Sequence, residues 1–437
     1  MFERSRRGER ALLIQPHAPG RSEAESLEEF VELARSAGAT VVARLAARIE
    51  RPSPALLIGT GKAEEARRIC EEQGADLVLV NHPLTPVQER NLEKLLGARV
   101  VDRTGLILDI FAQRARSFEG KLQVELAQLK HLSTRLVRGW THLERQRGGA
   151  IGLRGPGETQ LETDRRLLAE RVRMLARRLE KVQTQRTQAR RARLRSEVPR
   201  VALVGYTNAG KSTLFNALTG SEAYAADQLF ATLDPTVRRV EAIAGGGIVL
   251  ADTVGFVRDL PHDLVAAFRS TLSEARDADL LLHVVDAADP QREERMGQVD
   301  AVLAEIGADD IPQLLVFNKI DLVEGADPRS DAGIGHARPR IHVSARDGLG
   351  LGLLREAIAA RIERRRIHRT VFLPARAGRL RARLFQAGAV VAEHYDREDD
   401  GWRLELDVPE ALVEQICSAG DAESRALRGQ LLEPAHA

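Results

Sequence analysis

The sequence contains little cysteine, no long apolar run and few lysines. Cys70 and Cys417 are the only two cysteines among 437 residues, too few for a disulfide framework and typical of a reducing cytosol. No apolar run reaches the ~20 residues that a membrane-spanning helix needs. The first ten residues lack the apolar core of a secretory signal, and no lipidation motif is visible. We therefore expect a cytoplasmic protein without membrane insertion.

Lysine is much rarer than arginine. Lysine and arginine together number 65, of which only seven are lysine. The chain therefore uses arginine for generic positive charge, and the positions that keep lysine are candidates for a specific role. The charge is also unevenly spread, because residues 114–200 carry a net charge of +13 while the whole chain carries +2 and the remainder −11.

The order of apolar strands and amphipathic helices predicts an α/β fold in four parts. Residues 1–113 alternate strands and helices, which indicates an N-terminal α/β domain with a parallel sheet. Residues 114–199 predict a basic helical hairpin, because leucines recur at steps of three and four on both sides of a glycine-rich tip loop at 139–159. Residues 200–366 alternate strands and helices again, and residues 367–437 predict a small C-terminal α+β domain.

The expected strands of the first part are 11–14, 40–45, 55–59, 76–80 and 98–101, with helices at 22–37, 62–73 and 86–96. The third part is expected to hold strands at 200–204, 248–251, 279–285, 313–317 and 340–343, and a loop at 324–339. The last part is expected to hold strands at 370–374, 389–395 and 402–408 and helices at 376–387 and 410–419.

A glycine-rich motif follows the strand expected at 200–204. It reads G-Y-T-N-A-G-K-S, the G-x-x-x-x-G-K-S pattern of a P-loop between a strand and a helix. Its backbone N–H groups would face the α- and β-phosphates, Lys211 would reach the β/γ oxygens, and the Ser212 hydroxyl would bind Mg²⁺. The predicted nucleotide-binding residues of this motif are Gly205, Tyr206, Thr207, Asn208, Ala209, Gly210, Lys211 and Ser212.

A D-x-x-G motif follows the strand expected at 248–251. Asp252 can hold Mg²⁺ through water, and the amide of Gly255 can sense the γ-phosphate. Between this motif and the P-loop, residues 230–236 read F-A-T-L-D-P-T, where a switch loop should supply a threonine to Mg²⁺. Thr232 and Thr236 both qualify chemically. The nucleotide-binding residues predicted from these two segments are Phe230, Ala231, Thr232, Leu233, Asp234, Asp252, Thr253, Val254 and Gly255.

The third motif sets the base that is bound. Asn318, Lys319, Ile320 and Asp321 are similar to the N-K-x-D signature of translation-factor-type GTPases, in which the aspartate accepts from guanine N1–H and the exocyclic amine. A mismatched purine would leave that carboxylate unpaired, which is costly. The stem of Lys319 would lie against the base, and the S-A-x loop of Ser344, Ala345 and Arg346 would contact guanine O6 through its backbone.

Phe256 stands directly after Gly255, where many GTPases carry a glutamine that orients the attacking water. Its side chain can neither donate nor accept a hydrogen bond. We therefore expect slow intrinsic hydrolysis that needs a partner or a monovalent cation. Asn208 stands where several cation-dependent GTPases carry a potassium-binding asparagine, so K⁺ is a candidate cofactor beside Mg²⁺.

Together these motifs resemble the HflX family, ribosome-associated GTPases of the Obg–HflX group. The resemblance covers nearly the whole chain, and residues 154–166 and 58–65 add to it, while the C-terminal part matches only in position and length. In this family the threonine at the Thr232 position is used for Mg²⁺. The resemblance therefore implies Lys211, Thr232 and Gly255 as catalytic residues and Ser212 and Thr232 as metal ligands.

The family resemblance also implies a function. It predicts a GTPase that binds the large ribosomal subunit and separates stalled or idle ribosomes into subunits in a GTP-dependent manner. The alternative is a ribosome-assembly GTPase acting on immature large subunits, since both would share every motif. We expect a monomer that binds GTP and GDP.

The basic hairpin independently indicates RNA, because a net charge of +13 is an electrostatic footprint for phosphate. Its tip, with Trp140, Arg145, Arg147 and Arg154, is expected to enter a ribosomal RNA cavity; a solvated basic coiled coil is the alternative. Residues 59–62 read G-T-G-K and are either a tight strand-to-helix turn or an RNA phosphate contact. His283 is unclustered and is expected to be a packing or surface residue.

Overall fold

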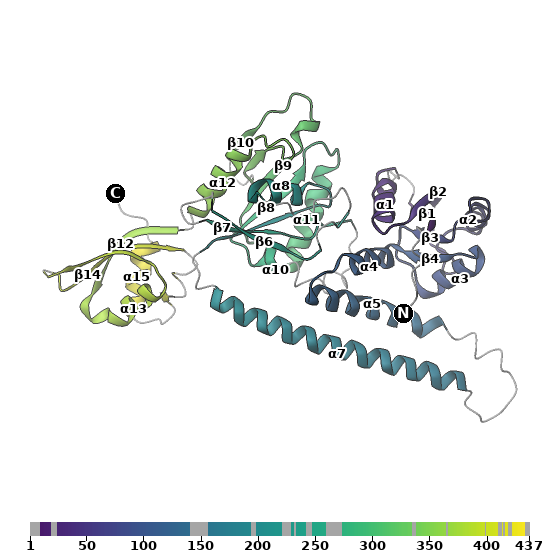
Figure 1. Ribbon diagram of the computed structural model, residues 1–437, viewed down its shortest axis with the longest axis horizontal. Helices are drawn as coiled ribbons and strands as arrows, with labels where there is room; N and C mark the ends of the chain where they lie inside the picture. Colours follow the sequence, from purple (N-terminus) through teal and green to yellow (C-terminus); the bar gives the residue numbers. More distant parts are fainter. Residues whose placement is uncertain are drawn as a thin grey trace.

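The computed structural model describes residues 9–18, 24–139, 156–193, 198–220, 229–230, 233–241, 247–258, 273–333, 338–363, 366–397, 399–409, 413, 416–417 and 422–432. Within these residues the chain forms three β-sheets with flanking helices and a pair of long helices (Figure 1). The seven-stranded sheet lies between the four-stranded N-terminal sheet and the three-stranded C-terminal sheet (Figure 1). In the same view the long helix α7 runs beneath the four-stranded and seven-stranded sheets.

The N-terminal unit, residues 9–114, is a parallel sheet between two pairs of helices. The strands are β1 (Arg10–His17), β2 (Thr40–Arg48), β3 (Leu77–Val80) and β4 (Arg99–Asp102), in the order β2-β1-β3-β4. The helices are α1 (Ala24–Ser36), α2 (Thr60–Gln73), α3 (Pro86–Leu96) and α4 (Arg103–Arg114).

The two faces of this sheet are buried by different helices, because successive side chains of a strand point to opposite faces. Leu12 and Ile14 of β1 pack with residues of α2 and α3, whereas Leu13 packs with residues of α1 and α4. All strand pairs are parallel. The predicted N-terminal α/β arrangement is confirmed.

Two local predictions are wrong. Residues 55–59 form no strand; they make a turn closed by an isolated bridge between Ser53 and Leu57, with Leu57 at a φ of 66°. Leu57 and Ile58 are nevertheless buried, so the apolar run packs against the core without a strand partner. The loop expected at 324–339 contains a short strand, β10 (Arg329–Asp331), whose three residues are all exposed and therefore give no apolar signal.

The long helices are α5 (Phe118–Gly139) and α7 (Pro156–Arg193). Leu122 and Leu126 of α5 and Leu175 of α7 are buried together, whereas Leu132 is 49% exposed. The glycine-rich loop expected to extend to residue 159 ends earlier, because α7 begins at Pro156, a residue well suited to a first helical turn. Residues 140–155, which include the predicted tip, lie outside the described residues.

The central unit, residues 198–363, is a seven-stranded sheet in the order β10-β11-β9-β8-β5-β7-β6. Its further strands are β5 (Arg200–Gly205), β6 (Thr236–Val240), β7 (Ile248–Asp252), β8 (Leu280–Asp286), β9 (Gln313–Asn318) and β11 (Arg340–His342). Helices α8 (Lys211–Thr219), α10 (Ser273–Arg276), α11 (Arg292–Ile306) and α12 (Leu351–Glu363) flank it. The edge strands β6 and β10 pair antiparallel to their neighbours and the others pair parallel.

The C-terminal unit, residues 366–432, is an antiparallel sheet in the order β12-β14-β13, packed against helices. It contains β12 (Arg366–Pro374), α13 (Gly378–Gln386), β13 (Val390–Asp396), β14 (Gly401–Pro409) and α15 (Ala422–Leu432). The sequence did not predict α15, and most of the helix expected at 410–419 lies outside the described residues. Among the helices that are described, none is both long and apolar enough to cross a bilayer.

His283 lies in the middle of β8 and is 1% exposed, which confirms a packing position. Its Nδ1 atom is 3.8 Å from Oδ1 of Asp300, whose carboxylate is bound by both terminal nitrogens of Arg338. Burial lowers the pKa of His283 to about 4 and outweighs the opposing effect of Asp300. The folded protein therefore favours the neutral imidazole.

This burial predicts a pH-dependent stability. The unfolded chain binds a proton at His283 near pH 6.5, but the folded chain does so only near pH 4, so stability falls as pH decreases through this window. We expect the calorimetric midpoint of the native chain to drop more between pH 7 and pH 5 than that of His283→Gln. The matched control is His394→Gln, at an exposed position, which should behave like the native chain. Equal drops in all three proteins would contradict the assignment.

Candidate functional site

The predicted P-loop connects β5 to α8 in the central unit. Asn208 and Gly210 both have positive φ values, 61° and 89°, so the loop curls tightly before α8 begins at Lys211. A Cβ atom on Gly210 would lie 2.2 Å from Nδ2 of Asn318, which leaves room only for glycine. The N-terminus of α8 therefore meets the end of β9 at very close range, and the backbone N–H groups there can face an anion.

Lys211 is nearly buried at the inner side of this loop. Its Nζ atom donates to the carbonyl oxygens of Gly205 (3.1 Å) and Tyr206 (2.7 Å). Burial lowers the pKa of Lys211 to about 8, a shift that the charge of Asp252 opposes. The ammonium is thus held by the loop that it would serve in phosphate binding.

Ser212 and Asp252, both predicted to act around Mg²⁺, lie together. The Ser212 hydroxyl donates to Oδ2 of Asp252 at 2.7 Å, and Thr253 anchors the end of β7 by donating to the Leu203 carbonyl. A hydroxyl and a carboxylate oxygen are the hard donors that Mg²⁺ prefers, so this pair fits the ion. Thr236 opens β6 opposite Asp252, whereas Ala231 and Thr232 lie outside the described residues.

The D-x-x-G segment runs directly beside the P-loop. The N–H of Thr207 donates to the Phe256 carbonyl (2.7 Å) and the N–H of Phe256 to the Gly205 carbonyl (3.2 Å). Gly255 therefore lies against the P-loop, where an added Cβ atom would be 3.0 Å from Nζ of Lys211. The Phe256 side chain is 2% exposed and packs in the core together with Val254, so it does not reach the solvent side of the site.

Asn318 joins three of the predicted motifs. Its Nδ2 atom donates to the Ala209 carbonyl of the P-loop, and its Oδ1 atom accepts from the Ala345 N–H, both at 2.9 Å. The side chain is buried, so both bonds are shielded from water. One amide thus fixes the P-loop and the S-A-R loop to the end of β9.

The neighbouring charged residues are also paired. Oδ1 of Asp321 accepts from the Ser344 hydroxyl (2.6 Å), while Oδ2 forms an ion pair with Arg346 (2.9 Å). Lys319, at a φ of 66°, forms an ion pair with Asp286 (2.7 Å). Ile320 is buried beneath them. Both carboxylate oxygens of Asp321 thus have partners within the protein, and the motif alone did not predict the ion pair with Arg346.

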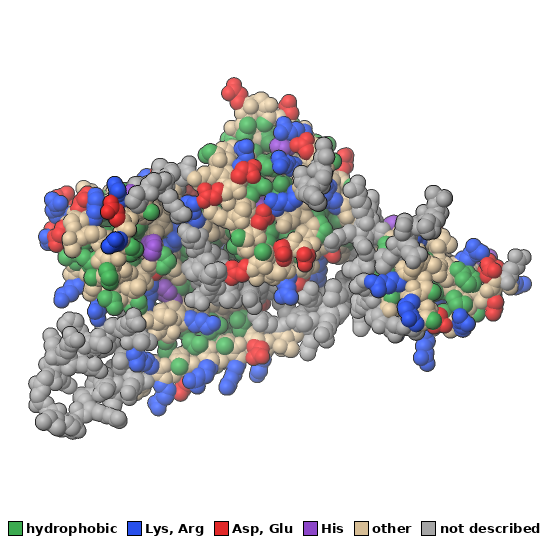
Figure 2. Space-filling model, turned by 180° about the vertical axis from the view of Figure 1, so that it is seen from behind, with side chains coloured by type: hydrophobic (Ala, Val, Ile, Leu, Met, Phe, Trp, Pro, Cys, Tyr) green, Lys and Arg blue, Asp and Glu red, His purple; other side chains and the backbone are tan. Residues whose placement is uncertain are grey.

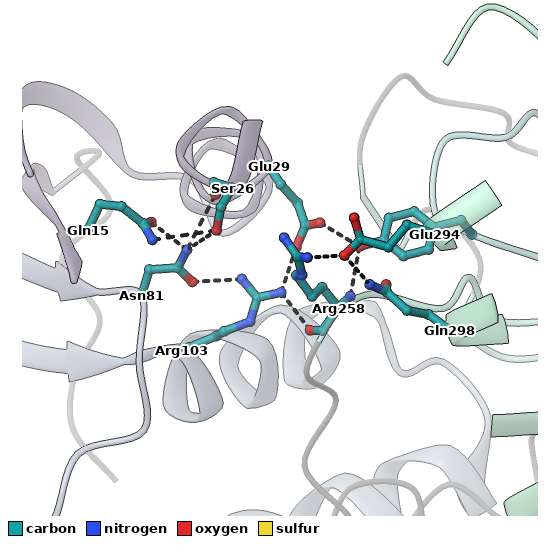
Figure 3. A network of polar contacts seen from close by, with 9 residues as sticks. Gln15, Ser26, Glu29, Asn81, Arg103, Arg258, Glu294 and Gln298 are labelled. Carbon is teal, nitrogen blue, oxygen red and sulfur yellow. Dashed lines mark hydrogen bonds and ion pairs between the residues drawn. The ribbon is translucent and has the colours of Figure 1, made fainter. Parts of the chain in front are cut away.

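The sequence also missed a junction between the N-terminal and central units, which Figure 3 shows around Glu29, Arg103 and Arg258. The Tyr206 hydroxyl donates to Oε2 of Glu29 in α1 (2.5 Å) and accepts from the N–H of Arg258 (2.8 Å). Burial and the nearby Glu29 carboxylate raise the pKa of Tyr206, so this hydroxyl keeps its proton. The amide of Asn208 donates to Glu32 of the same helix at 3.2 Å.

Arg103 completes this junction from the other side. Its guanidinium donates to Asn81 Oδ1 (2.7 Å), Glu29 Oε1 (2.6 Å) and the Arg258 carbonyl (2.7 Å) (Figure 3). Asn81 directly follows β3 and Arg103 directly follows β4, so the carboxyl edge of the N-terminal sheet faces the segment after Gly255. No short sequence motif signals such a contact between residues 155 positions apart.

Comparisons with known proteins match the chain in three consecutive stretches. The models described as GTP-binding GTPase N-terminal, GTP-binding GTPase Middle Region and 50S ribosome-binding GTPase match residues 24–112, 114–193 and 200–319. The solved crystal structure of SsGBP in complex with GDP is similar with 26% identity and a TM-score of 0.48, covering 80% of this chain and 98% of that one.

Curated relatives match over nearly the full length. GTPase HflX of Escherichia coli (strain K12) is 52% identical over 95% of this chain and 97% of its own length. GTPase HflX of Caldanaerobacter subterraneus subsp. tengcongensis is 46% identical over 93% of both chains. These similarities, together with the P-loop geometry, show that the chain belongs to the HflX family of GTPases and hydrolyses GTP.

Proposed function

We propose that this GTPase binds the large ribosomal subunit in its GTP-bound form and separates stalled or idle ribosomes into subunits. The observation that carries the proposal is a solvent-facing row of basic side chains on α7, a helix of 38 residues. The exposed basic residues along it are Arg173, Arg177, Arg178 and Lys181. Figure 2 shows Lys and Arg side chains gathered along the lower edge of the molecule, where α7 runs. Such a row suits the phosphates of an RNA helix.

Two observations support the ribosome as the partner: the description of the matching family model and the chemistry of arginine. The name of the model that matches residues 200–319 includes 50S ribosome binding, and the planar guanidinium both pairs with phosphate and stacks on bases. We propose that residues 1–113, 114–199, 200–366 and 367–437 act as four domains, with the tip of the second at the RNA. The alternative is a role in assembly of immature large subunits. Sucrose gradients of mature ribosomes with the protein and GTP distinguish the two, because only a splitting factor would separate mature ribosomes into subunits.

We further propose the roles of the site residues. Lys211 would bind the β/γ oxygens, the Gly255 amide the γ-phosphate, and Asp321 the guanine edge. P-loop GTPases use Mg²⁺ together with GTP. Ser212 and Thr232 would hold that ion, with Thr236 as the alternative to Thr232 and Asp252 acting through water. The ion would neutralise charge that develops on the phosphates during transfer.

The ribosome proposal predicts nucleotide-dependent co-sedimentation. We expect the full chain to pellet with ribosomes in a non-hydrolysable GTP analogue and much less in GDP. Replacing Arg145, Arg147 and Arg154 with alanine should weaken pelleting at least tenfold while leaving GTP affinity unchanged, because each lost arginine removes a phosphate contact. The charge-matched control replaces Arg48, Arg51 and Arg68, which are exposed on the N-terminal unit. Equal pelleting of both triple variants and the native chain would reject the tip as the contact.

The absence of a water-orienting side chain at Phe256 predicts slow hydrolysis by the chain alone, on the order of 10⁻³ s⁻¹ or below, as for GTPases without their activator. We propose that ribosomes or K⁺ supply the missing help, with Asn208 contributing to the K⁺ site. Turnover should rise at least tenfold when ribosomes are added or when K⁺ replaces Na⁺. Fast turnover in Na⁺ without ribosomes would contradict both sources of help.

A further inference from the structure

The segment between the P-loop and Asp252 is held by residues far away in the sequence. The N–H of Leu229 donates to Oγ of Ser36, the last residue of α1, at 3.1 Å. The ring of Phe230 meets the ring of Phe111 in α4 edge to face, with centroids 4.7 Å apart. The start of this segment therefore packs on the N-terminal unit.

The conformation of Phe230 adds to this observation. Its φ is 57°, in the left-handed region that bulky residues rarely adopt, and its side chain is 2% exposed. Such a backbone conformation persists only where the surroundings hold it in place. Leu233 is buried in the same core, so the contacts with α1 and α4 fix this conformation.

Asp234 anchors the other end of the segment to the start of α5. Its Oδ2 atom accepts from the N–H groups of Arg116 and Ser117, both at 2.7 Å, and Oδ1 accepts from the Ser117 hydroxyl at 2.5 Å. Ser117 in turn accepts from the N–H of Gly120 in the first turn (2.9 Å). A carboxylate at a helix N-terminus is favourable, because it binds unpaired N–H groups and meets the positive end of the dipole.

The approach of Asp234 to α5 depends on Gly120. A Cβ atom at residue 120 would lie 2.4 Å from Oδ1 of Asp234 and 2.9 Å from Oγ of Ser117. Any larger residue there would push the carboxylate away from the helix. The F-A-T-L-D-P-T motif predicts Asp234 at the nucleotide; in the structure its carboxylate accepts from Arg116 and Ser117, directly before α5.

We infer that the N-terminal unit and α5 form a clamp that positions the switch segment for GTP, with Asp234 as a positioning residue. The clamp consists of Ser36, Phe111 and Ser117 on one side and Leu229, Phe230 and Asp234 on the other. Thr232 and Thr236 each lie two residues from Asp234, within about 7 Å of chain, so displacement of Asp234 moves whichever threonine binds the ion. The inference thus rests on the proposed role of a switch threonine.

The clamp also connects nucleotide recognition to the helical pair. Because Asp234 binds Arg116 and Ser117 directly before α5, a shift of α5 changes the position of the switch segment. By the same linkage, a nucleotide that orders the segment favours one position of α5. GDP lacks the γ-phosphate and does not need the switch segment, so the clamp acts on GTP binding alone.

The test is the variant Gly120→Ala in the full chain. Gly120 has an ordinary helical backbone, so alanine there displaces Asp234 without straining the helix. We expect the affinity for a non-hydrolysable GTP analogue with Mg²⁺ to fall about tenfold, because the hydrogen bonds to the Asp234 carboxylate that position the switch segment are lost. GDP affinity should stay within twofold, because GDP does not engage the switch segment. The matched control is Gly378→Ala in α13, where an added Cβ meets nothing within 4 Å.

A second variant guards against misfolding. Asp234→Asn preserves the shape of the side chain but replaces one acceptor oxygen with a donor. Like Gly120→Ala, it should lower the ratio of GTP-analogue affinity to GDP affinity. An unchanged or raised ratio of GTP-analogue to GDP affinity in both variants would overturn the clamp. Thr232→Ala and Thr236→Ala test the threonine role separately: the ligand is the one whose loss raises the Mg²⁺ requirement. Ribosome pelleting plays no part in either readout, so failure of the clamp and failure of the ribosome proposal are distinguishable.

Discussion

The shared arrangement of the N-terminal and central units depends on the bonds that Glu29 and Arg103 of the first make to Tyr206 and Arg258 of the second. The Glu29 and Arg103 side chains are nearly buried, at 11% and 5% exposure, and their ends are 2.6 Å apart. A buried ion pair is costly unless further hydrogen bonds complete it, and removing one partner leaves an uncompensated charge. Here Tyr206, Asn81 and the Arg258 carbonyl complete the pair. The P-loop and the segment after Gly255 are therefore both hydrogen-bonded to the N-terminal unit.

The core confirms this dependence, since one buried cluster runs through both units without interruption. It contains Phe30 and Phe111 from the N-terminal unit together with Phe230 and Phe256 from the central one. Side chains in such a core have few alternative packings, so a shift on one side is felt on the other. The P-loop of this GTPase is consequently packed against the N-terminal unit, although every residue of the P-loop comes from the central one.

The sequence predicted the parts of the site whose chemistry is local. Gly210, Lys211 and Ser212 follow a strand and open a helix, and the structure shows that arrangement with Asn318 beside it. Two of the few lysines lie beside the P-loop and at the end of β9: the Lys211 ammonium is bound by two carbonyl oxygens and Lys319 forms an ion pair with Asp286, whereas exposed arginines line α7. Long-range contacts were not predictable. From the sequence, Glu29 in α1 looks like an ordinary solvent-exposed charge on a helix, and only the fold brings the Tyr206 hydroxyl to it. Strand β10 was missed for a similar reason, as its exposed polar residues take their conformation from pairing with β11.

The most direct test of a shared nucleotide site is a double-mutant cycle on nucleotide affinity. Arg103→Ala and Tyr206→Phe each remove one side of the junction, and Arg99→Ala, at an exposed position of β4, is the control partner for Tyr206→Phe. If the junction acts as a unit, the effects of the first two changes on GTP-analogue affinity will fall short of additivity by about 0.5–3 kcal/mol, as for residues in one network. Effects of Arg103→Ala and Tyr206→Phe that add within about 0.5 kcal/mol, like those of the control pair, would contradict it.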